Sequence, residues 1–270
     1  MLSVELDTLM LERLKRQGMV TVSELVRDLG VTAMTVRRHL LKLEKTGLLQ
    51  KVHGGAILIS DETLHEAAFA NKEQVADCEK NLIAREALTL IKDGDAILLD
   101  AGTTVFQLAK LLKGKRDLTV VTSDLHTALE LCTSDIRLFF AGGEIEKDLG
   151  RARGVRTLEF FSEIHVDISF LGISAISDGF VLGCYSFDNP ELKRAMLRCG
   201  SKKVLLTDRG KFGRKAFAQV GPLSMIDVLI TDKEFNEREM SYLAENNVQL
   251  LQTRNVHSSS SPALCRGPLI

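Results

Sequence analysis

Features that would assign a protein to a membrane or secreted class are missing from this sequence. No apolar run approaches the roughly 18–20 residues that a helix needs to span a bilayer. The first residues, MLSVELDTLM, lack the basic region, long apolar core and cleavage site of a signal peptide. The cysteines are scattered without a C-x-x-C pair. Their spacing argues against a zinc site or a disulfide framework, and it is typical of a protein in a reducing cytoplasm.

An excess of charge of one sign is also missing, since 35 Lys and Arg accompany 36 Asp and Glu for a net charge of −1. The balance is uneven, because residues 1–58 carry nine basic and six acidic side chains and the remaining residues carry 26 and 30. From Gly30 to His53 there are five basic residues and one acid, Glu44. Phosphate contacts supply most nonspecific affinity for DNA, so this local basic surface indicates DNA as a partner. The excess is modest, and we therefore expect a homo-oligomer that presents two or more copies of it.

The segment from Thr32 to Thr46, TAMTVRRHLLKLEKT, has the clearest pattern. Val36, Leu40 and Leu43 recur at helical spacing and would bury one stripe. The hydroxyl of Thr32 can accept a free backbone N–H at the start of this helix. The opposite face is polar and basic, and such a helix fits the major groove of DNA. That face consists of Thr35, Arg38, Lys42 and Lys45, with Arg37 at its edge.

A basic helix alone is more often a solvated surface helix, so the elements around it decide its interpretation. Val22–Leu29 has the spacing of a short helix, and Gly30 can adopt the positive φ of the turn in a helix-turn-helix. An earlier helix has a packing stripe of Leu6, Leu9, Met10 and Leu14 and is closed by Gly18. Residues 47–55 contain two short extended runs that would form a wing. Together these elements predict a winged helix-turn-helix domain over residues 1–58.

The remainder of the chain predicts an α/β domain. Residues 59–79 are acidic, polar and weakly periodic, which predicts a linker. Over residues 80–253 short apolar strands alternate with amphipathic helices, which predicts a Rossmann-like, mainly parallel sheet covered on both faces. The expected strands are 96–100, 118–122, 137–141, 168–172, 203–207, 228–231 and 248–251. Residues 254–270 include four consecutive serines and lack periodicity, so a disordered tail without a function is expected there.

Small and hydroxylic residues follow five of the predicted strands, and ligands of open α/β sheets bind beyond the carboxyl ends of the strands. In the first of these loops Gly102 allows close backbone approach, and the N–H groups and hydroxyls of Thr103 and Thr104 would point at an anion. Ordinary helix capping explains one such loop equally well. Five loops at one edge, together with Lys193 and Lys211, predict a small phosphorylated ligand. The loops are Asp100–Thr104, Thr122–Asp124, Ala141–Gly143, Gly172–Ser174 and Thr207–Asp208.

From about Leu9 to Leu251 the sequence resembles the DeoR family of bacterial transcriptional regulators. The N-terminal correspondence is TVSELVRDLGVTAMTVRRHLLKLEKTGLLQKVHGGA. In the second domain the similar segments are LLDAGTT, TVVTSDL, FAGGEI, FLGISAI, ELKRAM and TDRGKFGRKAF. The combination is highly specific, although no single segment is.

The resemblance implies a winged helix-turn-helix joined to a sensor domain related to the ribose-phosphate and glucosamine-phosphate isomerases. It implies an oligomer that binds operator DNA, usually to repress sugar or polyol catabolic genes, and that is released by a phosphorylated intermediate. No catalytic residue, cofactor or metal is expected. The effector site carried over by position consists of Asp100, Gly102, Thr103, Thr104, Thr122, Ser123, Gly142, Gly143, Lys193 and Lys211.

The sequence departs from the pattern of the family at several positions. His39 stands where Asp usually follows the two arginines, which would alter the local charge and the base preference. Ala101 replaces a common Ser, and Ser123-Asp124 replaces a usual Asn-Ser, which could narrow the choice of ligand. The segment Gly183–Pro190 stands where many members are rich in Thr and Ser. The sugar is therefore not named.

Two other functions remain open from the residues alone. A sugar-phosphate isomerase fused to a DNA-binding module would need a carboxylate base, and Asp100, Asp188 and Glu191 are the candidates. None of them lies in the acid-rich kind of motif that those isomerases use. A winged helix that binds a protein partner would fit the modest positive charge. A steep dependence of binding on salt would instead indicate contacts to DNA phosphates.

The expected mechanism has two states. Thr35, Arg37 and Arg38 would reach into the major groove, where they contact bases. Ligand binding at the strand ends must favour a different oligomer geometry, because a ligand shifts an equilibrium only through differential affinity. The linker is the expected route of this signal. Contacts to the DNA backbone and from the wing are assigned to Lys42, Lys45, Lys51 and His53.

Overall fold

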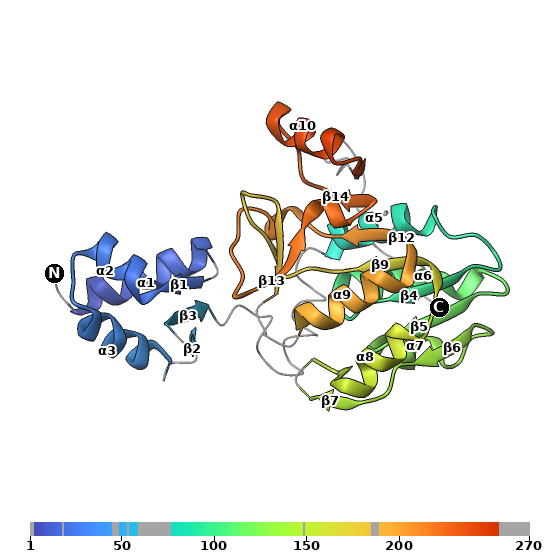
Figure 1. Cartoon of the computed structure of the whole chain (residues 1–270), viewed down its shortest axis with the longest axis horizontal. Coiled ribbons are helices and arrows are strands. Elements are labelled where there is room, and N and C mark those ends of the chain that lie inside the picture. The colour runs from blue at the N-terminus through green and yellow to red at the C-terminus, as the bar shows by residue number, and fades with distance from the viewer. Residues whose placement is uncertain are drawn as a thin grey trace.

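The computed structural model describes residues 3–17, 19–44, 49–52, 54–58, 77–147, 149–184 and 189–253. Most of the expected linker (59–76) and the whole expected tail (254–270) lie outside these residues. In Figure 1 the helices near the N-terminus gather around a small sheet of their own, apart from the larger sheet formed by strands between residues 96 and 252.

The N-terminal part is a three-helix unit with a three-stranded antiparallel sheet. Its helices are α1 (Ser3–Gln17), α2 (Val22–Leu29) and α3 (Ala33–Glu44), and its strands are β1 (Met19–Thr21), β2 (Leu49–Val52) and β3 (Gly55–Leu58) in the order β1-β3-β2. The wing expected from the sequence is present as β2 and β3. Its third strand, β1, was not predicted, because three residues between two helices are too few to show a period. The buried core consists of Leu6, Met10, Leu14, Val20, Leu25, Val36, Leu40, Leu43, Leu49 and Ala56.

Local hydrogen bonds fix the ends of α2 and the start of α3. Thr21 and Glu24 form a capping box at the start of α2, with Glu24 N–H donating to Thr21 Oγ1 over 3.1 Å. The helix ends at Gly30, whose φ of 64° is easily reached only without a side chain. The N–H of Thr35 donates to Thr32 Oγ1 over 3.2 Å, so Thr32 caps α3 as predicted.

Leu9 corrects the predicted packing stripe of α1. The stripe runs through Leu6, Met10 and Leu14, which are all buried, whereas Leu9 is 39% exposed. Leu9 lies three positions after Leu6, at the edge of a stripe that repeats every four residues. Leu11, on the other edge, packs partly against the core instead.

His39 is also placed differently from the prediction. It is buried, and its Nδ1 lies 2.6 Å from Oδ1 of Asp7 on α1. Lys42 donates to the other oxygen of Asp7 over 2.7 Å. Burial alone would raise the pKa of Asp7, but the hydrogen bonds from Lys42 and His39 outweigh it and lower the pKa. His39 therefore joins α1 to α3 and does not alter the exposed face of α3.

Residues 96–252 contain a seven-stranded parallel sheet in the order β15-β14-β12-β9-β4-β5-β6. Strands β4, β5 and β6 follow one another outward, and the chain then returns to place β9 on the other side of β4. The order reverses between β4 and β9, which is the point where open α/β sheets bind ligands. The strands are β4 (Ala96–Leu99), β5 (Thr119–Thr122), β6 (Arg137–Phe140), β9 (Val166–Leu171), β12 (Gly200–Leu206), β14 (Val228–Thr231) and β15 (Gln249–Gln252).

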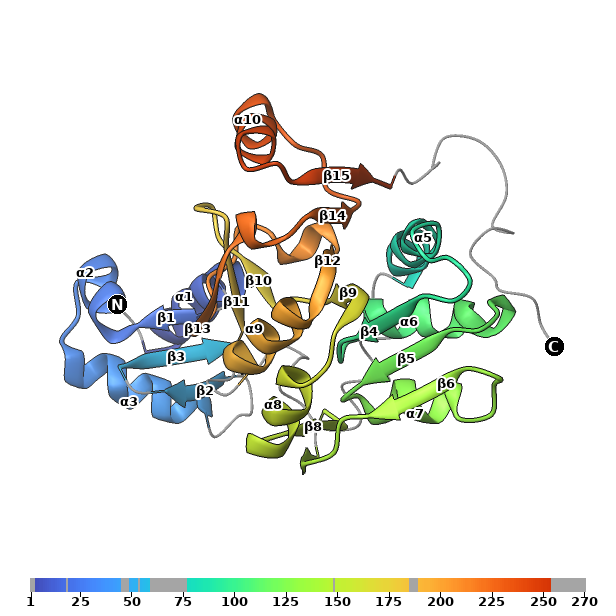
Figure 2. The same cartoon turned by 45° about the vertical axis from the view of Figure 1, so that its right-hand side comes forward.

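Helices cover both faces of this sheet (Figure 2). Leu99 of β4 belongs to the core beneath α5 and α6, whereas its neighbour Leu98 belongs to the core beneath α8 and α9. The buried faces explain why these strands read as continuous apolar runs. The helices are α5 (Asp77–Leu88), α6 (Thr103–Leu111), α7 (Leu125–Leu131), α8 (Val155–Ser162), α9 (Asn189–Cys199) and α10 (Glu237–Glu245). Helix α5 begins within the range 59–79 for which a linker was expected.

Two small sheets were not predicted. Strands β10 (Ala175–Ile176), β11 (Val181–Cys184) and β13 (Ala218–Pro222) form one of them, and β7 (Glu144–Glu146) and β8 (Arg151–Arg153) form a hairpin. In the hairpin Arg153 pairs with Glu144 over 2.9 Å, and Arg151 pairs with Glu146 over 2.6 Å. These are directly opposite residues in the register, so cross-strand ion pairs hold the hairpin together.

The cysteines agree only partly with the sequence analysis. Cys132, Cys184 and Cys199 are free thiols, but Cys78 on α5 is in a disulfide bond, which was not expected. Among the residues that the structure describes, no helix has the length and apolarity required to cross a membrane.

Replacing Asp7 with Asn should loosen the contact between α1 and α3, because His39 and Lys42 both lose a charged acceptor. We expect a loss of about 1–3 kcal/mol at neutral pH, the weight of hydrogen bonds to a charged group. Folding lowers the pKa of Asp7, so its stabilising contribution is present above the ordinary value of 3.8 and is lost as the pH falls through the lowered value. Amide hydrogen exchange at neutral pH should be faster in α1 and α3 of the variant, with α9 unchanged.

The variant Lys42→Ala is the control for this experiment, since it removes only the exposed donor to Asp7. Its effect on exchange in α1 should be smaller. Equal protection of α1 in the wild-type protein and in Asp7→Asn would contradict the structural role of the pair.

Candidate DNA-binding and effector sites

Helix α3 has a sharply divided surface. Val36, His39, Leu40 and Leu43 are buried, and the outward side carries both basic and apolar residues. The exposed residues of α3 are Met34, Arg37, Arg38, Leu41 and Lys42, and Thr35 is half-buried.

The structure places the expected DNA-binding residues unequally. Arg37 and Arg38 are exposed side by side on α3. Lys42 is also exposed, but its ammonium is held by Asp7. The hydroxyls of Thr32 and Thr35 lie 3.0 Å apart and serve the start of the helix. The side chain of Lys51 and the residues Lys45 and His53 lie outside the part of the chain that the structure describes.

Two apolar residues of the outward face were missed by the sequence analysis. Met34 is 81% exposed and Leu41 is 45% exposed. With Arg38 they are spaced i, i+4 and i+7, which puts all three on one stripe. This spacing is visible in the sequence, but polar residues surround the stripe, so the helical period alone does not mark it as apolar.

At the reversal of strand order, a buried carboxylate joins three elements. Asp100 follows β4, and its Oδ2 accepts the N–H of Gly172, which follows β9, over 2.9 Å. The same oxygen pairs with the ammonium of Lys193 on α9, and both side chains are buried. Because removing either partner would leave an uncompensated buried charge, this pair is a strong constraint on the site.

The nearby thiol of Cys184 is not reactive. Burial raises its pKa to about 11, and the opposing field of Lys193 is too weak to offset burial. A thiol is a nucleophile only as the thiolate, so Cys184 stays inert at neutral pH.

The start of helix α6 offers donors to an anion. Its cap is Gly102, which has no side chain to accept the first backbone N–H groups. Thr103 is half-buried and Thr104 is buried. Since these N–H groups lie at the positive end of the helix, an anionic ligand is a suitable partner for them.

Two hydroxyl side chains at the end of β5 differ in their hydrogen bonding. Thr122 Oγ1 donates to the carbonyl of Leu99 over 2.7 Å and accepts from the N–H of Asp124 over 3.0 Å. Ser123 Oγ is buried and has no hydrogen-bond partner among the described residues. A buried hydroxyl without a partner is unfavourable, so Ser123 is available to a ligand or a water molecule.

The two glycines after β6 allow close approach of neighbouring groups. Both Gly142 and Gly143 are exposed, and Thr157 Oγ1 donates to the carbonyl of Gly142 over 2.8 Å. A Cβ atom on Gly143 would lie 2.3 Å from Thr157 Oγ1 and 2.5 Å from the carbonyl oxygen of Arg153, and φ there is +146°. Only glycine fits this position.

Lys211 lies on a short turn after β12, the 3-10 helix η2 (Arg209–Lys211). Burial, together with the positive charge of Arg214, lowers its pKa to about 8. Lys211 therefore loses its proton more easily than an ordinary lysine.

The hairpin of β7 and β8 closes over the end of β5, which the sequence analysis did not foresee. The N–H of Ala152 donates to the carbonyl of Ser123 over 2.7 Å, and Arg151 beside it is buried. The complementary segments E-x-E and R-x-R on either side of the turn were the pattern in the sequence that could have indicated this hairpin.

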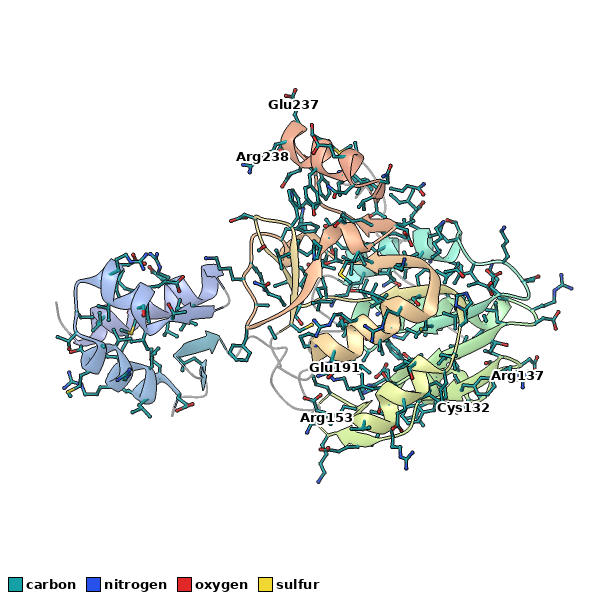
Figure 3. The ribbon with its side chains drawn as sticks, viewed as in Figure 1. Cys132, Arg137, Arg153, Glu191, Glu237 and Arg238 are labelled. Atoms are coloured by element: carbon teal, nitrogen blue, oxygen red, sulfur yellow. The ribbon has the colours of Figure 1, made fainter. Side chains whose placement is uncertain are left out.

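Asp124, which follows Ser123, caps α7 by accepting the N–H of Thr127 over 3.1 Å. In the view of Figure 3, Arg153 of β8 and Glu191 of α9 are drawn to the left of Cys132 and Arg137.

The carboxylates considered for an isomerase are poorly arranged for one. Asp100 is occupied by Lys193 and Gly172, Glu191 is exposed in the first turn of α9, and Asp188 lies outside the described residues. Within the described ranges no three His, Cys, Asp or Glu residues are placed to hold a metal ion.

The sequence matches two family models. The model of the DeoR-like helix-turn-helix domain matches residues 7–62, and the model of the DeoR C-terminal sensor domain matches residues 76–233. The two matches cover the recognition helix α3 and the carboxyl edge of the sheet as far as β14.

Curated relatives agree with this match over nearly their whole length. The chain is 34% identical to the glycerol-3-phosphate regulon repressor of Escherichia coli (strain K12), over 89% of this chain and 95% of the relative. It is also 34% identical to the HTH-type transcriptional repressor GlcR of Bacillus subtilis (strain 168), over 90% of this chain and 93% of the relative.

Among solved structures, the chain is similar to ribose 5-phosphate isomerase A from Methanocaldococcus jannaschii. The identity is 18% with a TM-score of 0.38, over 51% of this chain and 55% of that one. This likeness is too distant to indicate an activity. The two relatives described above are named as transcriptional repressors, and the chain belongs to the DeoR family of helix-turn-helix transcriptional regulators.

Proposed function

We propose that this protein is a repressor of genes for sugar or polyol catabolism. It binds operator DNA as a homo-oligomer through α3 and the wing, and it leaves the operator when a phosphorylated sugar or polyol occupies the carboxyl edge of the sheet. The observation that carries the ligand part is the uncapped start of α6 at the reversal of strand order, directly after Asp100 and its buried partner Lys193. The buried hydroxyl of Ser123 after the neighbouring strand β5 adds a further donor without a partner among the described residues.

The DNA part is supported by the exposed arginines of α3. Arg37 and Arg38 are exposed on a helix whose other face packs in the core of the N-terminal unit. This packing fixes the orientation of the helix and therefore the positions from which the two arginines extend. Lys42 is engaged by Asp7, which leaves one copy with few cations for phosphate contacts. This small number supports binding by more than one copy. For a bacterial regulator that acts on DNA, the cytoplasm is the expected location.

The names of the relatives suggest which effectors to test first. One of them is named for the glycerol-3-phosphate regulon, so glycerol 3-phosphate is the first compound to test. A second set should contain phosphorylated hexoses and pentoses. Ala101, Ser123 and the segment Gly183–Pro190 depart from the pattern of the family and would set the choice among them.

Transmission of the ligand signal is assigned to the linker and to the geometry of the oligomer. The ion pair between Lys215 and Glu24 of α2 spans 4.0 Å between partly exposed side chains. Such a pair contributes little free energy, so it would not by itself hold α2 in one position. A change in the spacing of two DNA-binding units would alter operator affinity without any fixed contact of this kind.

Replacing Arg38 with Ala should weaken binding to an operator by about 1–3 kcal/mol and relax the base preference at one position. Binding of the wild-type protein should fall steeply as salt rises, because phosphate contacts release counterions. The control is Arg156→Ala, which removes another exposed arginine, from α8 in the sensor. Fluorescence anisotropy over a range of salt concentrations measures both effects, and a flat response to salt would reject DNA binding.

Replacing Thr103 and Thr104 together should abolish the ligand response and leave DNA binding intact. Valine is preferred to alanine, since it keeps the β-branched shape of the buried Thr104 while the double change removes both hydroxyls. A ligand that binds only the folded state raises the melting temperature of the wild-type protein. Glycerol 3-phosphate and the sugar phosphates should therefore be compared by thermal shift, and a normal shift in the double variant would exclude these two hydroxyls from the site.

Phosphate binding should become weaker as the pH rises above about 8, the pKa of Lys211, toward its ordinary value of 10.5. A bound phosphate favours the ammonium, so binding near the lower value takes up a proton. In the ligand-free protein the unfolded chain binds more protons over this interval, and stability rises with pH there. Calorimetry in two buffers of different ionisation enthalpy measures the proton uptake, which should vanish in Lys211→Met. Equal uptake by the variant would assign the proton to another group.

A further inference from the structure

We infer that Met34 contacts the 5-methyl group of a thymine in the operator and thereby sets one position of base preference. The inference rests on the proposed binding of DNA through α3. It assigns a role to a side chain that neither the core nor the basic surface explains.

The exposure of Met34 is unusual for its size. It is 81% exposed, more than Leu129 at 70% and Leu41 at 45%. It does not belong to the core cluster of the N-terminal part. A single exposed apolar residue needs no explanation, but Met34 lies on the same stripe as Arg38, the residue best placed to enter a groove.

The position of Met34 along the helix favours contact with bases. It is the second residue of α3, and helix-turn-helix proteins touch base edges with the first residues of this helix. Side chains on a helix lean toward its N-terminus, which moves the thioether farther in that direction. Leu41 lies seven residues later, about 10.5 Å along the axis, and is therefore closer to the backbone of the duplex.

The chemistry of the side chain selects the base. In the major groove only thymine presents a methyl group, whereas the other bases present donors and acceptors there. A thioether donates no hydrogen bond and accepts only weakly, so it cannot satisfy those polar edges. Methionine is also flexible enough to fit a small apolar surface without strain. A thymine methyl is therefore the partner in the groove that Met34 can bury with a gain.

The test removes one methyl group at a time from the DNA. A duplex is first selected by the wild-type protein from a randomised pool, and each thymine is then replaced with uracil, which lacks only the 5-methyl group. We expect one position at which wild-type affinity falls about fourfold, the weight of one buried methylene-sized group. In Met34→Ala, affinity for the thymine duplex should fall about five- to tenfold, and uracil at that position should cost nothing further.

Two controls accompany the measurement. Leu129→Ala removes a similarly exposed apolar side chain from α7 of the sensor and should leave the uracil response unchanged. The melting temperature of Met34→Ala should equal that of the wild-type protein, because Met34 is outside the core. The uracil scan of the wild-type protein changes only the DNA, so its result remains valid even if a protein variant folds poorly.

Other results would overturn the inference. If Met34→Ala responds to uracil as the wild-type protein does, Met34 does not contact the thymine methyl group. If the wild-type protein is insensitive to uracil at every position, no methyl contact exists. A change in oligomer mass in Met34→Ala, with the same uracil response, would make Met34 a contact between protein copies. A pool from which no duplex is enriched would reject DNA binding itself, and with it this inference.

Discussion

The buried pair of Asp100 and Lys193 is the interaction on which the sensor depends. It ties the end of β4 to α9, and through Gly172 it ties both to the end of β9. Because the strand order reverses between β4 and β9, their ends would otherwise diverge into an open crevice. A phosphate entering beside α6 would share Lys193 with Asp100 and so change the contacts among these elements. That is the differential interaction a two-state response requires.

The pair also shows the limit of what the sequence could predict. The strands were predictable because buried parallel strands are continuous apolar runs, and the loops after them were predictable as hydroxylic and small. The contact between Asp100 and Lys193 joins residues 93 positions apart, and no local pattern indicates it. Strands of two to five residues, such as β10 and β13, carry too little periodicity to be recognised before their partners are known.

In the DNA-binding unit, too, some features were predictable from the sequence and others were not. The caps at Thr32 and Gly30 follow from local chemistry and were foreseen. The orientation of side chains across α3 was only partly foreseen, because it depends on how α1 packs. Asp7 of α1 draws His39 inward and engages Lys42, which leaves Met34 and Arg38 outward. The helical period indicated which stripe is buried, but not which polar residues are recruited to it.

A modest charge on α3 is consistent with a regulator that must also be released. Every phosphate contact strengthens binding to all DNA sequences, so a strongly basic monomer would remain bound whatever its ligand did. The ion pair between Lys42 and Asp7 reduces that nonspecific part, and in the proposed complex Met34 and Arg38 would make binding depend more on the bases. Under the proposed function, useful affinity would then require two copies at once. Since both copies would have to meet the duplex with a fixed spacing, a change in the geometry of the sensor would weaken both contacts together, and a coupling of about 1–3 kcal/mol would be enough for release.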